Sequence, residues 1–461
     1  MSNKNKESNQ KINIIVIFAS AIAALAGLLA GFDTGIISGA LEFIAKSFQL
    51  TTIGKETVVS MVLVGGVIGA LINGMLADKL GRKRMVVLAS LLYIVGSVAS
   101  ALSPSELFLE ISRFVLGLAI GGASASAPLY IAEVSPARIR GSLVTLFQLA
   151  ITIGILAAYF VDLAFTASGN WRFMLGSSFI PAVVLLIGMF GLPDSPRWLI
   201  KRGRLEDAKK ILNKIYEGDT TQVSTEIEDI QSVIATESEG SFAALFKPPA
   251  SFALIIAVGL FIIQQFVGIN TVIYYAPIIF KDAGMESSKA AIWATVSVGV
   301  VNVLATFIAI WLIDKVGRKP LMYAGLIGMI LSLTGMGIAY KLIGSTSSSE
   351  IGTITVIAVW IYIACFAFSF GPIPWLMMTE IFPLQLRGRA VSIATMTSWG
   401  CNLIVSFTFL SLLNAIGTSY TFWLYALVGI LGLFFVWRLV PETKGLSLEA
   451  IEEAKKEKFH V

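Results

Sequence analysis

The feature that most constrains this chain is a series of apolar runs, most of them about 20 residues long, separated by polar connections. A helix of about 20 apolar residues is long enough to cross the roughly 30 Å hydrocarbon core of a bilayer. Hydrophobic residues make up 56% of the 461 positions and charged residues only 14%, so a soluble fold would need one vast core. We therefore expect an all-α membrane protein with twelve spans, near residues 13–41, 56–77, 85–103, 106–132, 142–164, 171–192, 252–281, 289–313, 320–342, 351–380, 389–415 and 420–440.

Basic residues cluster in every second connection between these spans, and the intervening connections are poor in Lys and Arg. Basic loops stay on the cytoplasmic side of a membrane. We therefore expect a multi-pass protein of the plasma membrane, the cytoplasmic membrane in a bacterium, with both termini in the cytoplasm and the lipid bilayer as a partner. The basic connections are "DKLGRKR" at 78–84, "ARIRG" at 137–141, "RWLIKRGRLEDAKK" at 197–210, "DKVGRKP" at 314–320 and "LRGR" at 386–389.

The one long connection, residues 193–250, is charged and predicts two surface helices. Apolar residues recur there at helical spacing in two series, Leu205, Ala208, Ile211, Leu212 and Ile215, then Ile227, Ile230 and Ile234. We interpret the segment as a cytoplasmic spacer, with a regulatory domain as the alternative. The expected organisation is a six-helix bundle at 1–192, a helical linker at 193–250, a second six-helix bundle at 251–441 and a cytoplasmic tail at 442–461.

Three signature sequences occur twice, in the same order and at similar offsets. "DKLGRKRM" from residue 78 returns as "DKVGRKPL" from 314, "EVSPARIRG" from 133 as "EIFPLQLRG" from 380, and "PDSPRWL" from 193 weakly as "PETKG" from 441. The chain is therefore two homologous halves of about six helices each. Such duplication is typical of transporters in which a binding site lies between two rocking halves.

The spans offer no cluster suited to a metal, a cofactor or covalent catalysis. Cys365 and Cys401 lie in apolar spans without zinc or redox spacing, and His460, the only histidine, lies in the charged tail. A membrane enzyme would need a nucleophile, a metal cluster or a carboxylate pair there. We therefore expect no enzyme activity, no cofactor and no metal, and no nucleic-acid partner.

One acid, Asp33, lies inside the first apolar span. An ionised acid in a bilayer is costly, so it faces a water-filled cavity, is paired or is protonated, and it marks a functional site by default. Arg113, in the fourth span, is the only other strong charge that we expect at comparable depth in the first half. Pairing favours the charged form of Asp33 and separation favours the protonated form, so the pair can couple protons to conformation. The alternative is a static ion pair between two helices, although apolar residues would stabilise that contact at least as well.

Nine motifs follow one another along nearly the whole chain: "GFDTGIISG", "GMLADKLGRKR", "PLYIAEVSPARIRG", "PDSPRWL", "QQFVGINTVIYYAP", "DKVGRKP", "GPIPW", "EIFPLQLRGRA" and "PETKG". The chain resembles the sugar porter family of the major facilitator superfamily, above all its bacterial proton-coupled pentose and hexose symporters. The resemblance implies the major facilitator fold, with twelve helices in two halves and alternating access. It also implies proton coupling, because proton-coupled members keep an acid at the position of Asp33 and many facilitators do not.

Several amides within the spans suit a sugar, which is uncharged and covered with hydroxyl groups. Gln264, Gln265 and Asn270 lie together in the seventh span. Because the two glutamines are adjacent, one of them should face the cavity whatever the rotation of the helix. Asn302 and Gln148 are further candidates, although a membrane amide also serves simply to hydrogen-bond a neighbouring helix.

The aromatic candidate is Trp375, which follows Gly371, Pro372 and Pro374 in the tenth span. These three residues should interrupt the helix. The indole offers a stacking face and one N–H donor, and the resemblance implies that it closes over the sugar. The alternative is a tryptophan of the interfacial belt.

Two further pairs are weaker candidates. Trp399 and Asn402 are three residues apart in the eleventh span, so they share a helix face and extend the site. Tyr274 and Tyr275, near the outer end of the seventh span, resemble an outer gate, and an aromatic belt is the alternative.

Opposite charges at the ends of spans are expected to form a cytoplasmic gate. They are Asp78, Arg82, Glu133 and Arg140 in the first half, and Asp314, Arg318, Glu380 and Arg387 in the second. An exposed ion pair is worth about 0–1 kcal/mol, so several pairs between the halves would bias a conformational equilibrium without locking it. Four glycines form small-xxx-small faces that predict close helix packing: Gly65, Gly69, Gly117 and Gly121.

The sequence thus predicts a monomeric, proton-coupled symporter that imports a monosaccharide, either a pentose or a hexose. The alternatives are a sugar uniporter, a proton-coupled symporter of myo-inositol or another polyol, and a sugar sensor. Near Trp375, animal glucose facilitators carry an acid where this chain has Ala367, and bacterial xylose-type symporters carry glutamine where it has Ser398. The choice of sugar therefore stays open.

Overall fold

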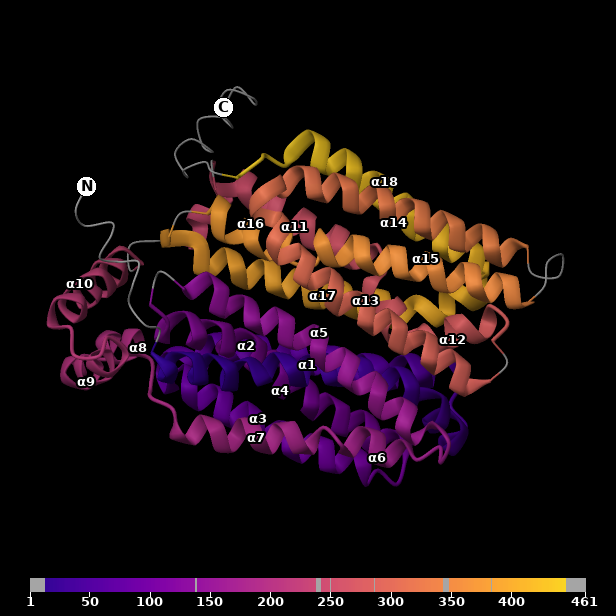
Figure 1. The fold of residues 1–461 in the computed structure, drawn as a ribbon, viewed down its shortest axis with the longest axis horizontal. Helices are drawn as coiled ribbons and strands as arrows, with labels where there is room; N and C mark the ends of the chain where they lie inside the picture. The colour runs from indigo at the N-terminus through magenta and orange to yellow at the C-terminus, as the bar shows by residue number, and fades with distance from the viewer. Residues whose placement is uncertain are drawn as a thin grey trace.

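The computed structural model describes residues 13–136, 139–237, 242–248, 250–285, 287–342, 348–382 and 384–444. Within these ranges, twelve helical segments are long and apolar enough to cross a membrane, which confirms the predicted number of spans. They form two bundles that lie against each other, one coloured indigo to magenta and the other orange to yellow (Figure 1).

Each bundle contains six of the spans. The first consists of α1 (Ile14–Phe48), α2 (Thr52–Leu80), α3 (Arg82–Ala101), α4 (Glu106–Val134), α5 (Arg140–Thr166), α6 (Trp171–Gly176) and α7 (Phe179–Gly191). The second consists of α11 (Ala250–Phe266), α12 (Ile269–Asp282), α13 (Ser288–Val316), α14 (Arg318–Lys341), α15 (Ser348–Phe368), α16 (Ile373–Ile381), α17 (Leu384–Ile416) and α18 (Thr418–Leu439).

Three spans are divided into two helices each, and only the break in the tenth was predicted. There α15 ends before Gly371, and α16 begins after Pro372. The seventh span breaks between α11 and α12 because Gly268 has φ 87°, a left-handed conformation that glycine adopts without strain. The sixth breaks between α6 and α7, where Pro181 in the first turn of α7 cannot donate to the preceding turn.

Glycine faces bring the helices of the first bundle into backbone contact. A Cβ atom added to Gly65 on α2 would lie 2.1 Å from the carbonyl oxygen of Phe114 on α4. One added to Gly121 on α4 would lie 2.0 Å from the carbonyl oxygen of Gly66, so the predicted close packing of α2 and α4 is confirmed. Gly31 holds α1 equally close to α5 and thereby fixes the helix that carries Asp33.

The linker forms α8 (Pro196–Lys201), α9 (Leu205–Ile215), α10 (Thr220–Glu237) and the short 3-10 helix η2 (Phe242–Phe246). Helices α8, α9 and α10 lie beyond one end of the bundles, which we call the linker end (Figure 1). The chain enters α1 at this end, because the Asn13 amide donates to the carbonyl oxygen of Lys214 on α9 at 2.6 Å. The connection from α1 to α2 therefore lies at the opposite end, which we call the far end.

Candidate functional site

A buried ion pair joins Asp33 on α1 to Arg113 on α4. The guanidinium donates from Nη1 to Oδ1 at 3.3 Å and from Nη2 to Oδ2 at 3.2 Å. Its Nε donates to the carbonyl oxygen of Val58 on α2 at 2.6 Å, so one side chain links three helices. Asp33 is 4% exposed and Arg113 is 0% exposed. Both carboxylate oxygens therefore face the cation in this conformation.

The break between α15 and α16 lies against the predicted amides. Gln264 Nε2 donates to the carbonyl oxygen of Phe370 at 2.6 Å. Gln265 Nε2 donates to Ser398 Oγ on α17 at 2.9 Å, and its Oε1 accepts a hydrogen bond from Asn270 Nδ2 at 2.7 Å. The structure thus brings these three amides into one network that spans α11, α12, α17 and the break.

Trp375 lies on the first turn of α16, just after the same break. Its ring meets the ring of Phe261 edge-on, with centroids 4.7 Å apart. The side chain is 38% exposed, whereas both glutamines of the amide network are buried. An indole that is held by one aromatic neighbour and still exposed suits stacking on the apolar face of a ring.

The remaining polar candidates lie on three helices. Asn402 on α17 is buried and accepts a hydrogen bond from Ser406 Oγ at 2.9 Å. Asn302 is buried on α13, and Gln148 is half-buried on α5. Among the described residues, no hydrogen bond joins these three amides to the Gln264 and Gln265 network.

Trp399, one turn before Asn402, lies at the contact between the bundles. A Cβ atom added to Gly66 on α2 would lie 2.6 Å from the Trp399 ring. Trp399 therefore packs against a site where only glycine leaves room for the indole.

Tyr274 and Tyr275 are both buried on α12. The Tyr275 hydroxyl donates to the carbonyl oxygen of Ser406 at 3.1 Å, and its ring stacks on Phe409 with centroids 5.2 Å apart. Tyr275 is therefore anchored within the second bundle, against α17.

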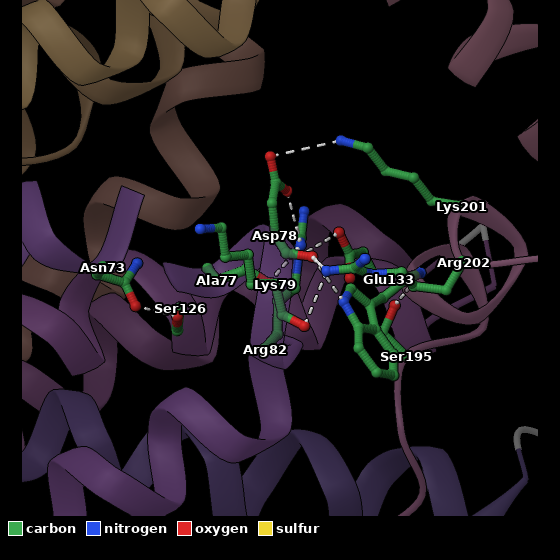
Figure 2. Close-up of polar contacts among 11 residues, drawn as sticks. Asn73, Ala77, Asp78, Lys79, Arg82, Ser126, Glu133, Ser195, Lys201 and Arg202 are labelled. Atoms are coloured by element: carbon green, nitrogen blue, oxygen red, sulfur yellow. Dashed lines mark hydrogen bonds and ion pairs between the residues drawn. The ribbon is translucent and has the colours of Figure 1, made fainter. Parts of the chain in front are cut away.

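At the linker end, Arg82 holds two acids of the first bundle (Figure 2). Its Nη1 donates to Asp78 Oδ1 at 3.1 Å, and its Nε donates to Glu133 Oε1 at 3.0 Å. Asp78 also pairs with Lys201 at 3.5 Å, and its carbonyl oxygen accepts from Trp198 Nε1 at 3.0 Å. Helix α8 is thereby attached to the turn between α2 and α3.

The second bundle repeats this arrangement. Arg318 Nη2 donates to Glu380 Oε1 at 2.8 Å, as the Arg82 guanidinium donates to Glu133. The same oxygen of Glu380 also accepts from Arg318 Nε at 3.2 Å. The repeated sequences therefore build the same contact twice.

Glu442 of the "PETKG" motif caps the start of α14. Its carboxylate accepts from the backbone N–H groups of Arg318 at 3.0 Å and Lys319 at 2.9 Å. It also accepts from the backbone N–H groups of Thr443 and Lys444. Burial on its own would raise the pKa of Glu442, but the four backbone donors outweigh it and hold the pKa below its ordinary value.

These ion pairs form within each bundle, whereas the sequence predicted pairing between the halves when the inner side is closed. Arg82 and Arg318 contact acids of their own half, and Arg140 pairs with Glu226 of α10 at 3.4 Å. Pairing between the halves in the state with the inner side closed stays a prediction, because the structure shows one conformation. The side chains of two members of the predicted set lie outside the described residues: Asp314 and Arg387.

Polar contacts do join the two bundles at the far end. Glu56 on α2 accepts from the backbone N–H of Ser411 on α17 at 2.7 Å and from its hydroxyl at 2.6 Å. Three further donors reach across: Lys281 Nζ to Glu42 Oε2 at 2.5 Å, Asn414 Nδ2 to Thr52 Oγ1 at 3.1 Å, and the Tyr159 hydroxyl to the carbonyl oxygen of Ile273 at 3.2 Å. The far end is therefore closed in this structure.

Two buried acids were not predicted as sites. The sequence set only Arg113 beside Asp33 as a strong charge at comparable depth in the first half, and it named neither of these two acids. Glu56 and Asp162 are both 1% exposed. The signal was present, because each stands in one of the expected apolar spans.

The chain matches a known family over almost its whole length. The family model described as "Sugar (and other) transporter" matches residues 19–454. The chain belongs to this sugar transporter family. The galactose-proton symporter of Escherichia coli (strain K12) is 43% identical over 451 residues, covering 97% of this chain and 96% of that relative. The D-xylose transporter of Levilactobacillus brevis is 43% identical over 436 residues and covers 94% of each chain.

A solved structure agrees with the fold of this sugar transporter. The xylose transporter XylE from E. coli, in a partially occluded inward open conformation, matches with a TM-score of 0.83 and 32% identity. The match covers 94% of this chain and 100% of that one. The chain therefore has the major facilitator fold, with two six-helix halves, and it is a transporter rather than an enzyme.

Proposed function

We propose that this protein is a proton-coupled symporter that imports a monosaccharide by alternating access. The observation that carries the proposal is the Asp33–Arg113 pair, which is a titratable acid and a fixed cation buried together between α1, α2 and α4. A charge at this depth is costly even when it is paired, so an ionisable residue here marks a transport role by default. The name of the E. coli relative, a galactose-proton symporter, supports the same assignment.

The sugar would bind where the amide network meets Trp375. Gln264, Gln265 and Asn270 offer paired donors and acceptors for hydroxyl groups, and Trp375 offers a stacking face. Helix breaks at membrane depth are tolerated where the backbone lines a cavity or is buried in protein, as beside Gly268 and Gly371. We assign weaker roles at the edge of this site to Gln148, Asn302, Trp399 and Asn402.

The linker end would face the cytoplasm, because the basic connections lie there. The far end then faces outside, and its closure corresponds to a state that opens towards the cytoplasm. In the opposite state, the linker-end charges of the two halves would approach each other and form the inner gate. Tyr274 and Tyr275 would belong to the outer gate, and we propose that a single chain carries out the whole cycle.

The direct test uses purified protein in liposomes with a pH-sensitive dye inside. Xylose, glucose, galactose, arabinose or myo-inositol is added outside, and sugar entry and interior pH are followed together. Acidification with one sugar, lost in Asp33→Asn while sugar exchange survives, would establish symport and identify the substrate. Sugar entry without acidification in the wild type would instead mean a uniporter in which Asp33 is only a structural partner of Arg113.

A further inference from the structure

The far end holds a second buried acid, Asp162 on α5, whose surroundings differ from those of Asp33. Its Oδ2 accepts a hydrogen bond from the backbone N–H of Gly39 on α1 at 3.0 Å. Its Oδ1 is buried and has no hydrogen-bond partner among the residues that the structure describes. The side chain is 1% exposed, so water does not reach it from the surface.

The close approach of α1 packs the Asp162 carboxyl directly against the backbone at Gly39. A Cβ atom added to Gly39 would lie 2.3 Å from the carboxyl carbon of Asp162 and 2.5 Å from Oδ2. Only glycine at this position lets the carboxyl reach the backbone of α1. The carboxyl is therefore part of the contact between the two helices and is not a side chain directed towards lipid.

Asp162 forms no ion pair with a charged group of the neighbouring helices among the described residues. Helices α1, α4, α6 and α13 pack against α5. On these helices, Asp33 pairs with Arg113, Glu42 pairs with Lys46 and Lys281, and Arg172 donates to the Ser103 carbonyl oxygen. Lys289 is exposed at the start of α13. On α5 itself, the Tyr159 hydroxyl donates to Ile273.

An ionised carboxylate in this position would have one backbone donor and no cation. Burying an unpaired charge costs far more than burying an unpaired hydroxyl group, which costs about 1–3 kcal/mol. A neutral acid with its proton on Oδ1 avoids this cost in this conformation. Asp33 differs from Asp162, because both oxygens of Asp33 face the Arg113 cation.

We infer that Asp162 is a second protonation site, which must take up a proton from the outer solution before the far end can close. The inference rests on the proposed function. Tyr159, three residues before Asp162 on α5, bonds across to α12 in this closed state. When the far end opens, that bond breaks and water can reach the outer part of α5. Water can then solvate the ionised carboxylate of Asp162 and offset the cost of its charge. The step is one proton transfer, from outer water to Oδ1, and the reverse transfer occurs on opening.

The test measures sugar counterflow in liposomes buffered to the same pH on both sides. Wild type, Asp162→Asn and Asp162→Glu are compared across about pH 5 to 9. Asparagine imitates the neutral acid and cannot ionise, whereas glutamate retains the titration. We expect counterflow by the wild type and Asp162→Glu to fall with rising pH, and at the alkaline end this fall should be steeper than in Asp162→Asn by up to about tenfold per pH unit, the contribution of one required proton. Counterflow by Asp162→Asn should keep only the part of the alkaline fall that the titration of Asp33 causes.

If sugar counterflow has the same pH profile in Asp162→Asn and in the wild type, the inference is overturned. That result would mean that the Asp162 carboxyl does not ionise during the transport cycle. If Asp162→Asn does not reconstitute, Asp162→Ser provides a second side chain that cannot ionise, and the same comparison applies. Absence of counterflow in the wild type with every sugar tested would instead contradict the proposed function. The two failures are therefore distinguishable.

Discussion

Glu56 and Ser411 meet across the two halves of the transporter, with the carboxylate accepting from both the backbone N–H and the hydroxyl of the serine. The contact places a buried acid of α2 directly on α17. Neither hydrogen bond can survive separation of the two bundles at the far end, so both must be exchanged for water in every transport cycle.

Replacing Glu56 should therefore favour opening of the far end. Hydrogen bonds to a charged group contribute about 1.5–3 kcal/mol each, so Glu56→Ala should raise the open population by about tenfold or more. Spin labels at Leu102 and Lys289, which are exposed on opposite halves near the far end, would report the change as a longer distance between the labels. The labels would be placed in a protein with Cys365 and Cys401 replaced by Ala. Glu56→Gln keeps one acceptor and should show a smaller shift, and equal distances in all three proteins would contradict the prediction.

Removing Arg113 should destabilise the protein more than removing the whole pair. Arg113→Met leaves the Asp33 carboxylate buried without a cation, which typically costs about 3–5 kcal/mol. Adding Asp33→Asn removes the charge, and the double variant should recover much of the lost thermal stability. The midpoint of unfolding in detergent measures both effects. Equal midpoints for the single and double variants would mean that Asp33 does not need its partner.

Trp375 should contribute sugar affinity without contributing to proton coupling. Trp375→Ala removes the stacking face and should raise the KM for sugar about tenfold, whereas Trp375→Phe keeps an aromatic face and should lose only part of this. The ratio of protons to sugar molecules should stay the same in both variants. A changed ratio would place Trp375 in the proton pathway, contrary to the site described above.

Glu442 should make the stability of the protein depend on acid pH. The pKa of Glu442 is lower in the folded protein than its ordinary value of 4.5. The carboxylate therefore stabilises the fold fully above pH 4.5, and this stabilisation is lost as the pH falls through the pKa in the folded protein. Glu442→Gln should be less stable than the wild type at neutral pH, and the difference should shrink as the medium becomes more acid. Unfolding midpoints measured from about pH 7 down to pH 3 would show whether the two curves converge. If the unfolding midpoints of the two proteins differ by the same amount at every pH, the charge of Glu442 does not contribute to the stability of the cap.

Most of the fold could be predicted because it follows from local patterns. The lengths of the apolar runs, the alternation of basic connections and the repeated loops each depend on neighbours in the sequence. The break at Gly371 and Pro372 was predictable for the same reason, since proline cannot continue the hydrogen bonding of a helix. The break at Gly268 was not, because a single glycine inside a span is normally tolerated and only its positive φ ends the helix.

The candidate site could be predicted only in part, because its contacts depend on tertiary structure. The pairing of Asp33 with Arg113 followed from the scarcity of charge within the spans. Asp162 was missed although it stands in an apolar span, and its contact with Gly39 was not predictable because Gly39 is far away in the sequence and adjacent in space. Arg82 contacts Asp78 and Glu133 of its own half, whereas the sequence predicted pairing between the halves, because a sequence specifies both states of a transporter and a structure displays one.

The cap on α14 makes the segment after the last span part of the second bundle. Glu442 reaches back to the turn that begins α14, and Lys444 Nζ donates to the carbonyl oxygen of Lys315 at 2.7 Å. A fusion or purification tag attached at Leu439 would therefore remove a structural clasp, whereas the same tag attached after Lys444 would leave it closed. For anyone who engineers this transporter, the usable attachment point begins beyond "PETKG" and not at the membrane boundary.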